Sequence, residues 1–143
     1  MLEVEGVFTM LVPDGWSATL SDGTYELTRS GDDGAAHVSV YNRADAPVSA
    51  DEARDLIRRF LARISPDGEA QVVVLPESEE QHRAVARCSD GTLDWLVFLV
   101  LWRKHFLMCS CTASPPSTML SDAEEMFATI HQPESTPKRR WRR

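Results

Sequence analysis

The chain has 143 residues, of which 43% are apolar and 26% charged, a composition typical of one folded domain with its own hydrophobic core and not of a disordered chain. Its formal net charge is −7, but residues 138–143 carry five of the 15 basic side chains, so residues 1–137 carry a net charge of −12. We expect so acidic a body to repel nucleic acid, and the few basic residues at the end do not make a nucleic-acid groove.

Neither the N-terminal residues nor the most apolar stretch of the chain indicates export or a membrane span. The first residues, Met1 to Glu5, include two acids where a secretory signal needs basic residues, so we expect a cytoplasmic protein. The most apolar stretch, residues 93–101, contains Asp94 and is far shorter than the roughly 20 residues that a bilayer helix needs. We therefore expect a strand there and no membrane insertion.

Aspartate-glycine pairs divide the chain into short segments. Five of the seven glycines follow an aspartate, a pair that favours tight turns between antiparallel strands. Residues 8–12 predict a first strand, which ends at a turn over residues 13–16. Residues 24–29 and 36–42 alternate apolar and polar side chains, and each predicts a strand with one solvated face.

The pattern then changes to that of a helix. Ser49 and Glu52 form a capping box, and a helical stripe of apolar residues follows at positions 53, 56, 57, 60, 61 and 64. The opposite side carries Arg54, Arg58, Arg59 and Arg63. Such a cluster can hold phosphate, but Asp55 stands four residues before Arg59, so an ordinary solvated helix side with ion pairs is favoured.

Four more strands are predicted at residues 71–75, 83–88, 93–102 and 106–113, joined by links short enough for hairpins. Ser121 and Glu124 form a second capping box, which predicts a second helix that ends before Pro133. The expected fold is an α/β (α+β) sandwich, with a mostly antiparallel six- to seven-stranded sheet and two principal helices. Residues 1–131 form a single domain on this prediction.

Residues 132–143 form a basic C-terminal tail. Its Pro, Ser and Thr content followed by basic residues is typical of flexible ends that add solubility. Trp141 stands among arginines, so docking of the tail on the acidic body or on a partner remains an alternative.

Three motifs resemble the PsbP-like superfamily. They are the Phe8…Val12-Pro13-Asp14-Gly15-Trp16 segment, residues 36–40 before the helix, and residues 84–102 in the meander. The resemblance covers residues 7–131 and implies an α/β sandwich whose members mostly bind other proteins and carry no shared active site. The superfamily includes an extrinsic photosystem II subunit, a nuclear Ran-binding release factor and small bacterial cytoplasmic Eag-type effector chaperones. With no targeting segment and no matching Ran contact, the bacterial branch is the nearest in type.

The candidates for metal or nucleophilic chemistry are three cysteines and four scattered histidines. His105, Cys109 and Cys111 share one strand face, but two even-length hairpin turns place Cys88 on the other face of the sheet. Buried packing of the thiols is therefore favoured over a zinc site, and neither a disulfide nor a cofactor is expected. Ser110 lacks the glycine-flanked turn of a hydrolase nucleophile, so no catalytic residue is assigned.

The strand at residues 93–102 is apolar on both faces, which a half-exposed antiparallel strand does not require. Two arrangements explain it. Either one helix covers each face, or both helices share one face and leave a groove on the other. In the second case the residues that bind a partner segment or a second copy are Trp95, Leu99, Leu101, Phe106 and Met108.

The interpretation that best fits these features is a non-catalytic protein-binding module, with a chaperone or adaptor role that shields an apolar segment of a partner. Self-association as a homodimer is an alternative use of the same groove. A toxin-immunity-type protein with an acidic binding surface is a second alternative. The third is a small metal-binding or hydrolytic enzyme that uses His105, Cys109 and Cys111.

Overall fold

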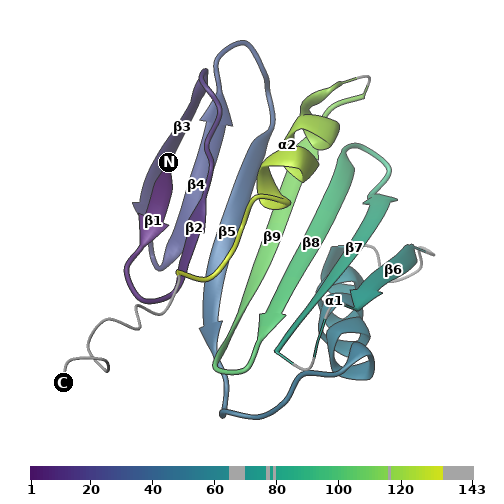
Figure 1. Ribbon diagram of the computed structural model, residues 1–143. Helices are drawn as coiled ribbons and strands as arrows, with labels where there is room; N and C mark the ends of the chain where they lie inside the picture. The colour runs from purple at the N-terminus through teal and green to yellow at the C-terminus, as the bar shows by residue number, and fades with distance from the viewer. Residues whose placement is uncertain (65–69, 77, 79, 116, 134–143) are drawn as a thin grey trace, which may run out of the picture.

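The computed structural model describes residues 1–64, 70–76, 78, 80–115 and 117–133, so the predicted basic tail lies outside the described residues from position 134 onward. Seven strands form one antiparallel sheet in the order β3-β4-β5-β9-β8-β7-β6, and β1 and β2 form a separate hairpin. The predicted α+β sandwich is confirmed (Figure 1). The described elements are β1 (Leu2–Val4), β2 (Phe8–Met10), β3 (Trp16–Ser21), β4 (Thr24–Arg29), β5 (Ala35–Asn42), α1 (Ala50–Ile64), β6 (Gln71–Pro76), β7 (Gln81–Ser89), β8 (Asp94–Trp102), β9 (His105–Ala113) and α2 (Met119–Phe127).

The two helices lie on opposite faces of the sheet. Figure 1 shows α2 in front of the sheet and α1 behind it. Helix α2 packs on β8 and β9, whereas α1 packs on β6, β7 and β8. The arrangement with one helix on each face is therefore the correct one. The alternative in which both helices share a face is wrong, because β8 is apolar on both sides and each side needs its own cover.

Each helix closes its own hydrophobic core. On the α2 face, Phe98, Val100 and Trp102 of β8 pack in one cluster with α2 and with Phe8 and Met10 of the β2 strand. On the α1 face, the other side chains of β8 pack against the buried stripe of α1. That second cluster contains Val97, Leu99, Leu101, Met108, Ala53, Ile57 and Leu61.

Two side-chain interactions fix the start of α1. Ser49 Oγ accepts the backbone N–H of Glu52 at 3.1 Å, which confirms the predicted cap. The Glu52 carboxylate does not complete the capping box but binds Arg43, whose side chain is only 12% exposed. Arg43 also donates to the carbonyl oxygens of Trp102 and Arg103. The guanidinium therefore ties the first turn of α1 to the β8–β9 hairpin.

Two elements differ from the prediction. Residues 16–21 form strand β3, which is not among the predicted strands, and the pair Asp22 and Gly23 (φ 51° and 79°) makes the two-residue turn to β4. Helix α2 begins at Met119, two residues before the predicted cap at Ser121, and the N–H of Met119 donates to Ser117. The capping box at Ser121 is wrong because that residue already lies inside the helix.

Part of the sheet has no cover on the α1 face. Helix α1 packs mainly on β6, β7 and β8, and the register aligns the side chains that β3, β4, β5 and β9 present beyond it on the same face. Most of them carry hydroxyl groups. The hydroxyl-bearing side chains are Ser17, Thr19, Ser21, Thr24, Thr28, Ser39, Tyr41, Ser110 and Thr112.

The two-sided burial of β8 sets the cost of core substitutions. We expect Leu101→Ala to lower the free energy of unfolding by about 2–5 kcal/mol, because Leu101 has no exposed surface beneath α1. Leu20→Ala is the matched control, with an expected change below about 0.5 kcal/mol, since Leu20 is 62% exposed on β3. Urea unfolding of both variants measures the difference. Equal small changes in the two variants would contradict the packing of α1 on β8.

Candidate functional site

The structure separates the five predicted partner-binding residues. Leu99 and Leu101 are fully buried beneath α1, so the prediction that they line an open groove is wrong. Their burial follows from the position of the helix, since α1 covers the face that the groove needed to be free. Phe106 and Met108 lie on the same face of the neighbouring strand β9, where they pair with Leu101 and Leu99 and line a cavity beside α1, although Met108 is itself buried.

Trp95 belongs to the same face but serves the β7–β8 turn. Its indole Nε1 donates to the carboxylate of Asp90 at 3.0 Å. The pKa of Asp90 is lowered by the backbone N–H of Leu93, then by this indole and the N–H of Thr92. Trp95 therefore holds a loop in place, and it does not line the cavity beside Phe106 and Met108.

A cavity of about 190 Å³ lies between α1 and the open sheet face. We name it the α1–β9 groove. Its sheet side is formed by Phe106 and Met108 of β9 with Tyr41 of β5, and the rings of Tyr41 and Phe106 stack with centroids 4.8 Å apart. Its lining residues are Tyr41, Leu56, Arg59, Phe60, Arg63, Phe106 and Met108.

The helix supplies the other side of the groove through its 3.6-residue period. Leu56, Arg59, Phe60 and Arg63 stand at i, i+3, i+4 and i+7, so they form one flank of α1 beside its buried stripe. Arg59 pairs with Asp55 at 3.1 Å, as the i, i+4 spacing predicts. Both side chains are exposed, and such a pair contributes little to stability. Arg63 is exposed as well, so the guanidinium groups of Arg59 and Arg63 are both accessible to a bound carboxylate.

Register brings together one set of polar residues that looked scattered in the sequence. Glu26, His37 and Ser110 are cross-strand neighbours on the open face, and His37 Nε2 lies 3.3 Å from Glu26. Ser110 is only 7% exposed, and no hydrogen bond joins it to His37 in the described part of the chain. Acyl transfer also needs donors for an oxyanion, and the strand N–H groups here bond to neighbouring strands. This row pairs a base with an acid but does not complete a nucleophilic site.

The cysteines occupy two different faces, as the hairpin argument predicts. Cys109 and Cys111 pair with Phe98 and Leu96 and lie in the α2-side core, whereas Cys88 pairs with Trp95 and packs against the α1-side core. The first hairpin closes at Ser89 and Asp94, an even-length turn that keeps Cys88 on the predicted face. Within the described residues, no three His, Cys, Asp or Glu side chains are grouped as metal ligands would be.

Burial controls the chemistry of these thiols. Desolvation raises the pKa of Cys109 above its ordinary range and raises that of Cys111 to about 12. Desolvation and the nearby Asp90 charge raise the pKa of Cys88 as well. All three groups are free thiols that stay protonated at neutral pH, which makes them poor nucleophiles and poor metal ligands.

The raised pKa values make stability depend on alkaline pH. Unfolded thiols ionise near pH 8.5, whereas buried Cys109 and Cys111 keep their protons, so the native state binds more protons above that pH. We expect the free energy of unfolding to fall by up to about 1.4 kcal/mol per pH unit for each thiol between about pH 9 and 11. The slope should shrink in Cys109→Ala/Cys111→Ala, measured by urea unfolding at each pH. An unchanged slope would show that the thiols do not cause it.

Comparisons with known proteins support the fold alone. No protein-family model matches the chain, and no curated protein matches its sequence. A crystal structure from Bacteroides thetaiotaomicron is similar over 90% of this chain, with a TM-score of 0.59 and 19% sequence identity. This chain spans 46% of that longer chain. Within the described residues, no helix is both long and apolar enough to cross a membrane.

The groove contains residues that sequence reasoning assigned to other roles. Tyr41 belongs to the solvated side of the third predicted strand, and Arg59 and Arg63 belong to the solvated side of the first helix. A signal for Tyr41 was present, because a large aromatic ring ends an otherwise small and polar strand face. The meeting of this face with the arginine flank depends on the position of α1 over the sheet, which periodicity does not reveal.

Proposed function

We propose that this protein is a non-catalytic protein-binding module that holds an apolar side chain of a partner segment in the α1–β9 groove. The single observation that carries the proposal is the groove itself, in which the exposed ring of Tyr41 and the partly exposed ring of Phe106 lie next to two arginines, with buried Met108 at its base. Aromatic residues, methionine and arginine are the types enriched at protein interfaces and at their energetic hot spots. Tyr41 is 44% exposed, so its ring is available for contact.

The size of the groove favours a side chain over a small-molecule cofactor. Pockets for drug-sized ligands measure about 300–1,000 Å³, whereas this groove holds about 190 Å³. That volume suits one large apolar side chain, with the rest of the partner lying across the open face. The hydroxyl groups of that face supply hydrogen bonds to a polar or extended segment.

The arginines define the chemistry of the partner. Arg59 and Arg63 stand on the same flank as Leu56 and Phe60, so an anchoring Leu, Phe or Trp that enters the groove brings its neighbours within reach of two guanidinium groups. We therefore propose a partner segment with an apolar anchor flanked by Asp or Glu. A chaperone or adaptor role follows from the PsbP-like resemblance, and the three free thiols favour a reducing, cytoplasmic setting.

Selection from a randomised peptide library tests this proposal. Enriched peptides should share a Leu, Phe or Trp with Asp or Glu nearby, and Tyr41→Ala or Arg59→Glu should weaken their binding by about tenfold, the effect of a hot-spot residue. Arg58→Glu is the matched control, because it makes the same charge change on the same helix outside the groove. Fluorescence polarisation measures the affinities, and thermal unfolding checks that each variant folds.

Two results would contradict the proposal. One is a selection that enriches no peptide. The other is a set of peptides that bind wild type, Tyr41→Ala and Arg59→Glu equally well. If light scattering shows that the purified protein is a dimer and Tyr41→Ala makes it a monomer, the groove binds a second copy of this chain.

A further inference from the structure

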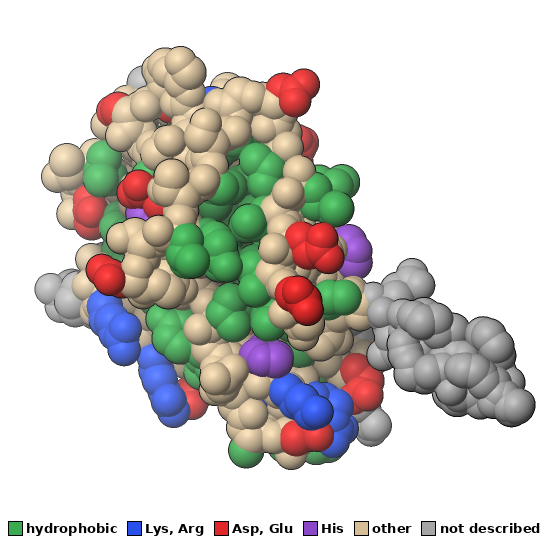
Figure 2. Space-filling view, turned by 90° about the vertical axis from the view of Figure 1, so that its left-hand side faces the viewer, with side chains coloured by type: hydrophobic (Ala, Val, Ile, Leu, Met, Phe, Trp, Pro, Cys, Tyr) green, Lys and Arg blue, Asp and Glu red, His purple; other side chains and the backbone are tan. Residues whose placement is uncertain are grey.

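A second cavity lies on the other side of the molecule, between the link from β2 to β3 and helix α2. It measures about 500 Å³, and its apolar part includes Leu11, Val12 and Trp16. Leu11 is 55% exposed, a large fraction for a leucine beside a core. Figure 2 shows hydrophobic side chains gathered in the middle of the face formed by the N-terminal strands, with Asp and Glu side chains beside them and basic side chains toward the lower end.

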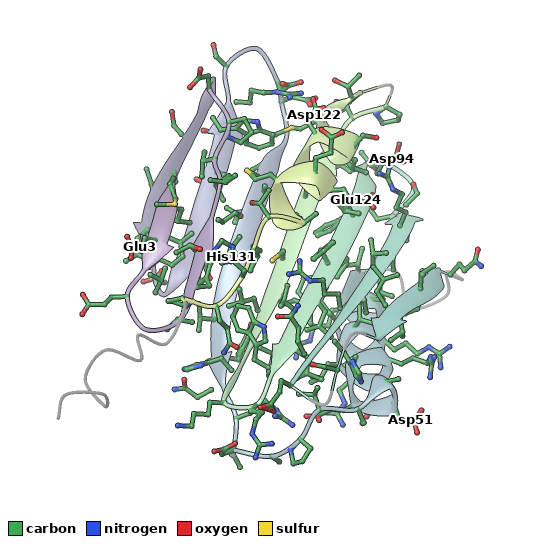
Figure 3. The ribbon with its side chains drawn as sticks, in the orientation of Figure 1. Glu3, Asp51, Asp94, Asp122, Glu124 and His131 are labelled. Atoms are coloured by element: carbon green, nitrogen blue, oxygen red, sulfur yellow. The ribbon has the colours of Figure 1, made fainter. Side chains whose placement is uncertain are left out.

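The rim of this cavity is acidic. Asp14, Asp122 and Glu125 line it together with one cation, Arg29. Figure 3 shows Asp122 on α2, beside the upper ends of the strands. Arg29 is already neutralised, because it binds both Asp122 and Asp32 and its guanidinium carbon lies 5.2 Å from the ring centroid of Trp16. We name this site the acidic cleft.

Two of the carboxylates have no cation beside them. Asp14 and Glu125 are both exposed, and no ion pair joins either one to a Lys, Arg or His of the described residues. Like charges placed together at a rim favour binding of a positively charged group. The cleft therefore calls for a ligand that combines cations with an apolar or aromatic group.

The C-terminal segment of the same chain has this chemistry. Residues 138–143 carry five cations and Trp141 within six positions. Thr129 lines the cleft, and His131 then pairs with Thr9 of β2 in an antiparallel bridge. Ten residues, 134–143, follow this bridge, and a fully extended chain of that length spans about 33 Å.

A third cavity close to Gln132 makes the choice of site selective. It is lined by Asp45 and Glu80 but also by Arg103 and Lys104, and Arg103 pairs with both of these acids. The carboxylates there are already matched by cations. Of these two cavities, the acidic cleft is therefore the one whose charge complements the segment.

We propose that residues 138–143 fold back onto the acidic cleft, with the Trp141 indole on the apolar floor and its basic neighbours paired with Asp14 and Glu125. The interaction gives the acidic body a bound basic segment of its own. It is independent of the α1–β9 groove, because the cleft lies beside α2 on the opposite face of the sheet.

Zero-length cross-linking of the full-length protein tests the proposal. A carbodiimide joins a lysine amine to a carboxylate in direct contact, and the chain contains two lysines, Lys104 and Lys138. We expect Lys138 to cross-link to Asp14 or Glu125 within one molecule, as identified by mass spectrometry of the monomer. The yield should fall about fivefold in about 0.5 M NaCl, since salt screens exposed charges.

The variants and isotope mixing decide between occupants. In Asp14→Asn/Glu125→Gln the Lys138 cross-links to these two positions should disappear. Cross-linking of Lys138 to Asp45 or Glu80 in place of the cleft would overturn the proposal, as would a Lys138 that forms no cross-link to Asp14 or Glu125 in the wild type. Cross-links found only between labelled and unlabelled molecules would show a second copy in the cleft and would also overturn it.

Discussion

Strand β8 carries apolar side chains on both of its faces, and a sheet buries both only when a separate layer covers each one. Helix α1 covers Leu99 and Leu101, whereas α2 and the β1–β2 hairpin cover the side that contains Phe98 and Trp102. The positions of the remaining elements follow from this division. Helix α1 packs mainly on β6, β7 and β8, so it leaves most of the same face of β3, β4 and β5 uncovered. On that uncovered face the strands present mostly polar side chains.

The position of the α1–β9 groove follows from the edge of the area that α1 covers on the sheet. Phe106 and Met108 lie on β9 between the apolar core under α1 and the hydroxyl-rich open face of the sheet. Tyr41 extends this apolar surface by stacking on Phe106. The arginine flank of α1 stands over the same boundary. A groove with an apolar floor and cationic side favours an anchored, acidic partner segment. On the α2 side the signs are reversed, with an acidic rim around an apolar floor. The two faces of the sheet therefore suit opposite kinds of ligand.

Local signals predicted much of the fold. Alternation identified β4 and β5, the Ser49 cap located α1, and turn parity placed Cys109 and Cys111 opposite Cys88. Strand β3 carries both alternation and an Asp-Gly turn, but it follows directly on the Pro13 to Trp16 turn, which by itself indicates a break in the sheet. The site was predictable only in part. Phe106 and Met108 were assigned correctly to one face, but the burial of Leu99 and Leu101 depends on α1 crossing three strands, a long-range arrangement that no local spacing encodes.

The two-sided cover of β8 is tested most directly by nuclear Overhauser contacts in solution, in protein labelled at the methyl groups of Ile and Leu and at the rings of Phe. The account predicts contacts from Ile57 of α1 to Leu99 or Leu101, and separate contacts from Phe127 of α2 to Phe98. It also predicts that Leu99 and Leu101 have none with Phe127. Contacts from both helices to the same side chains of β8, with the other side free of contacts, would contradict it.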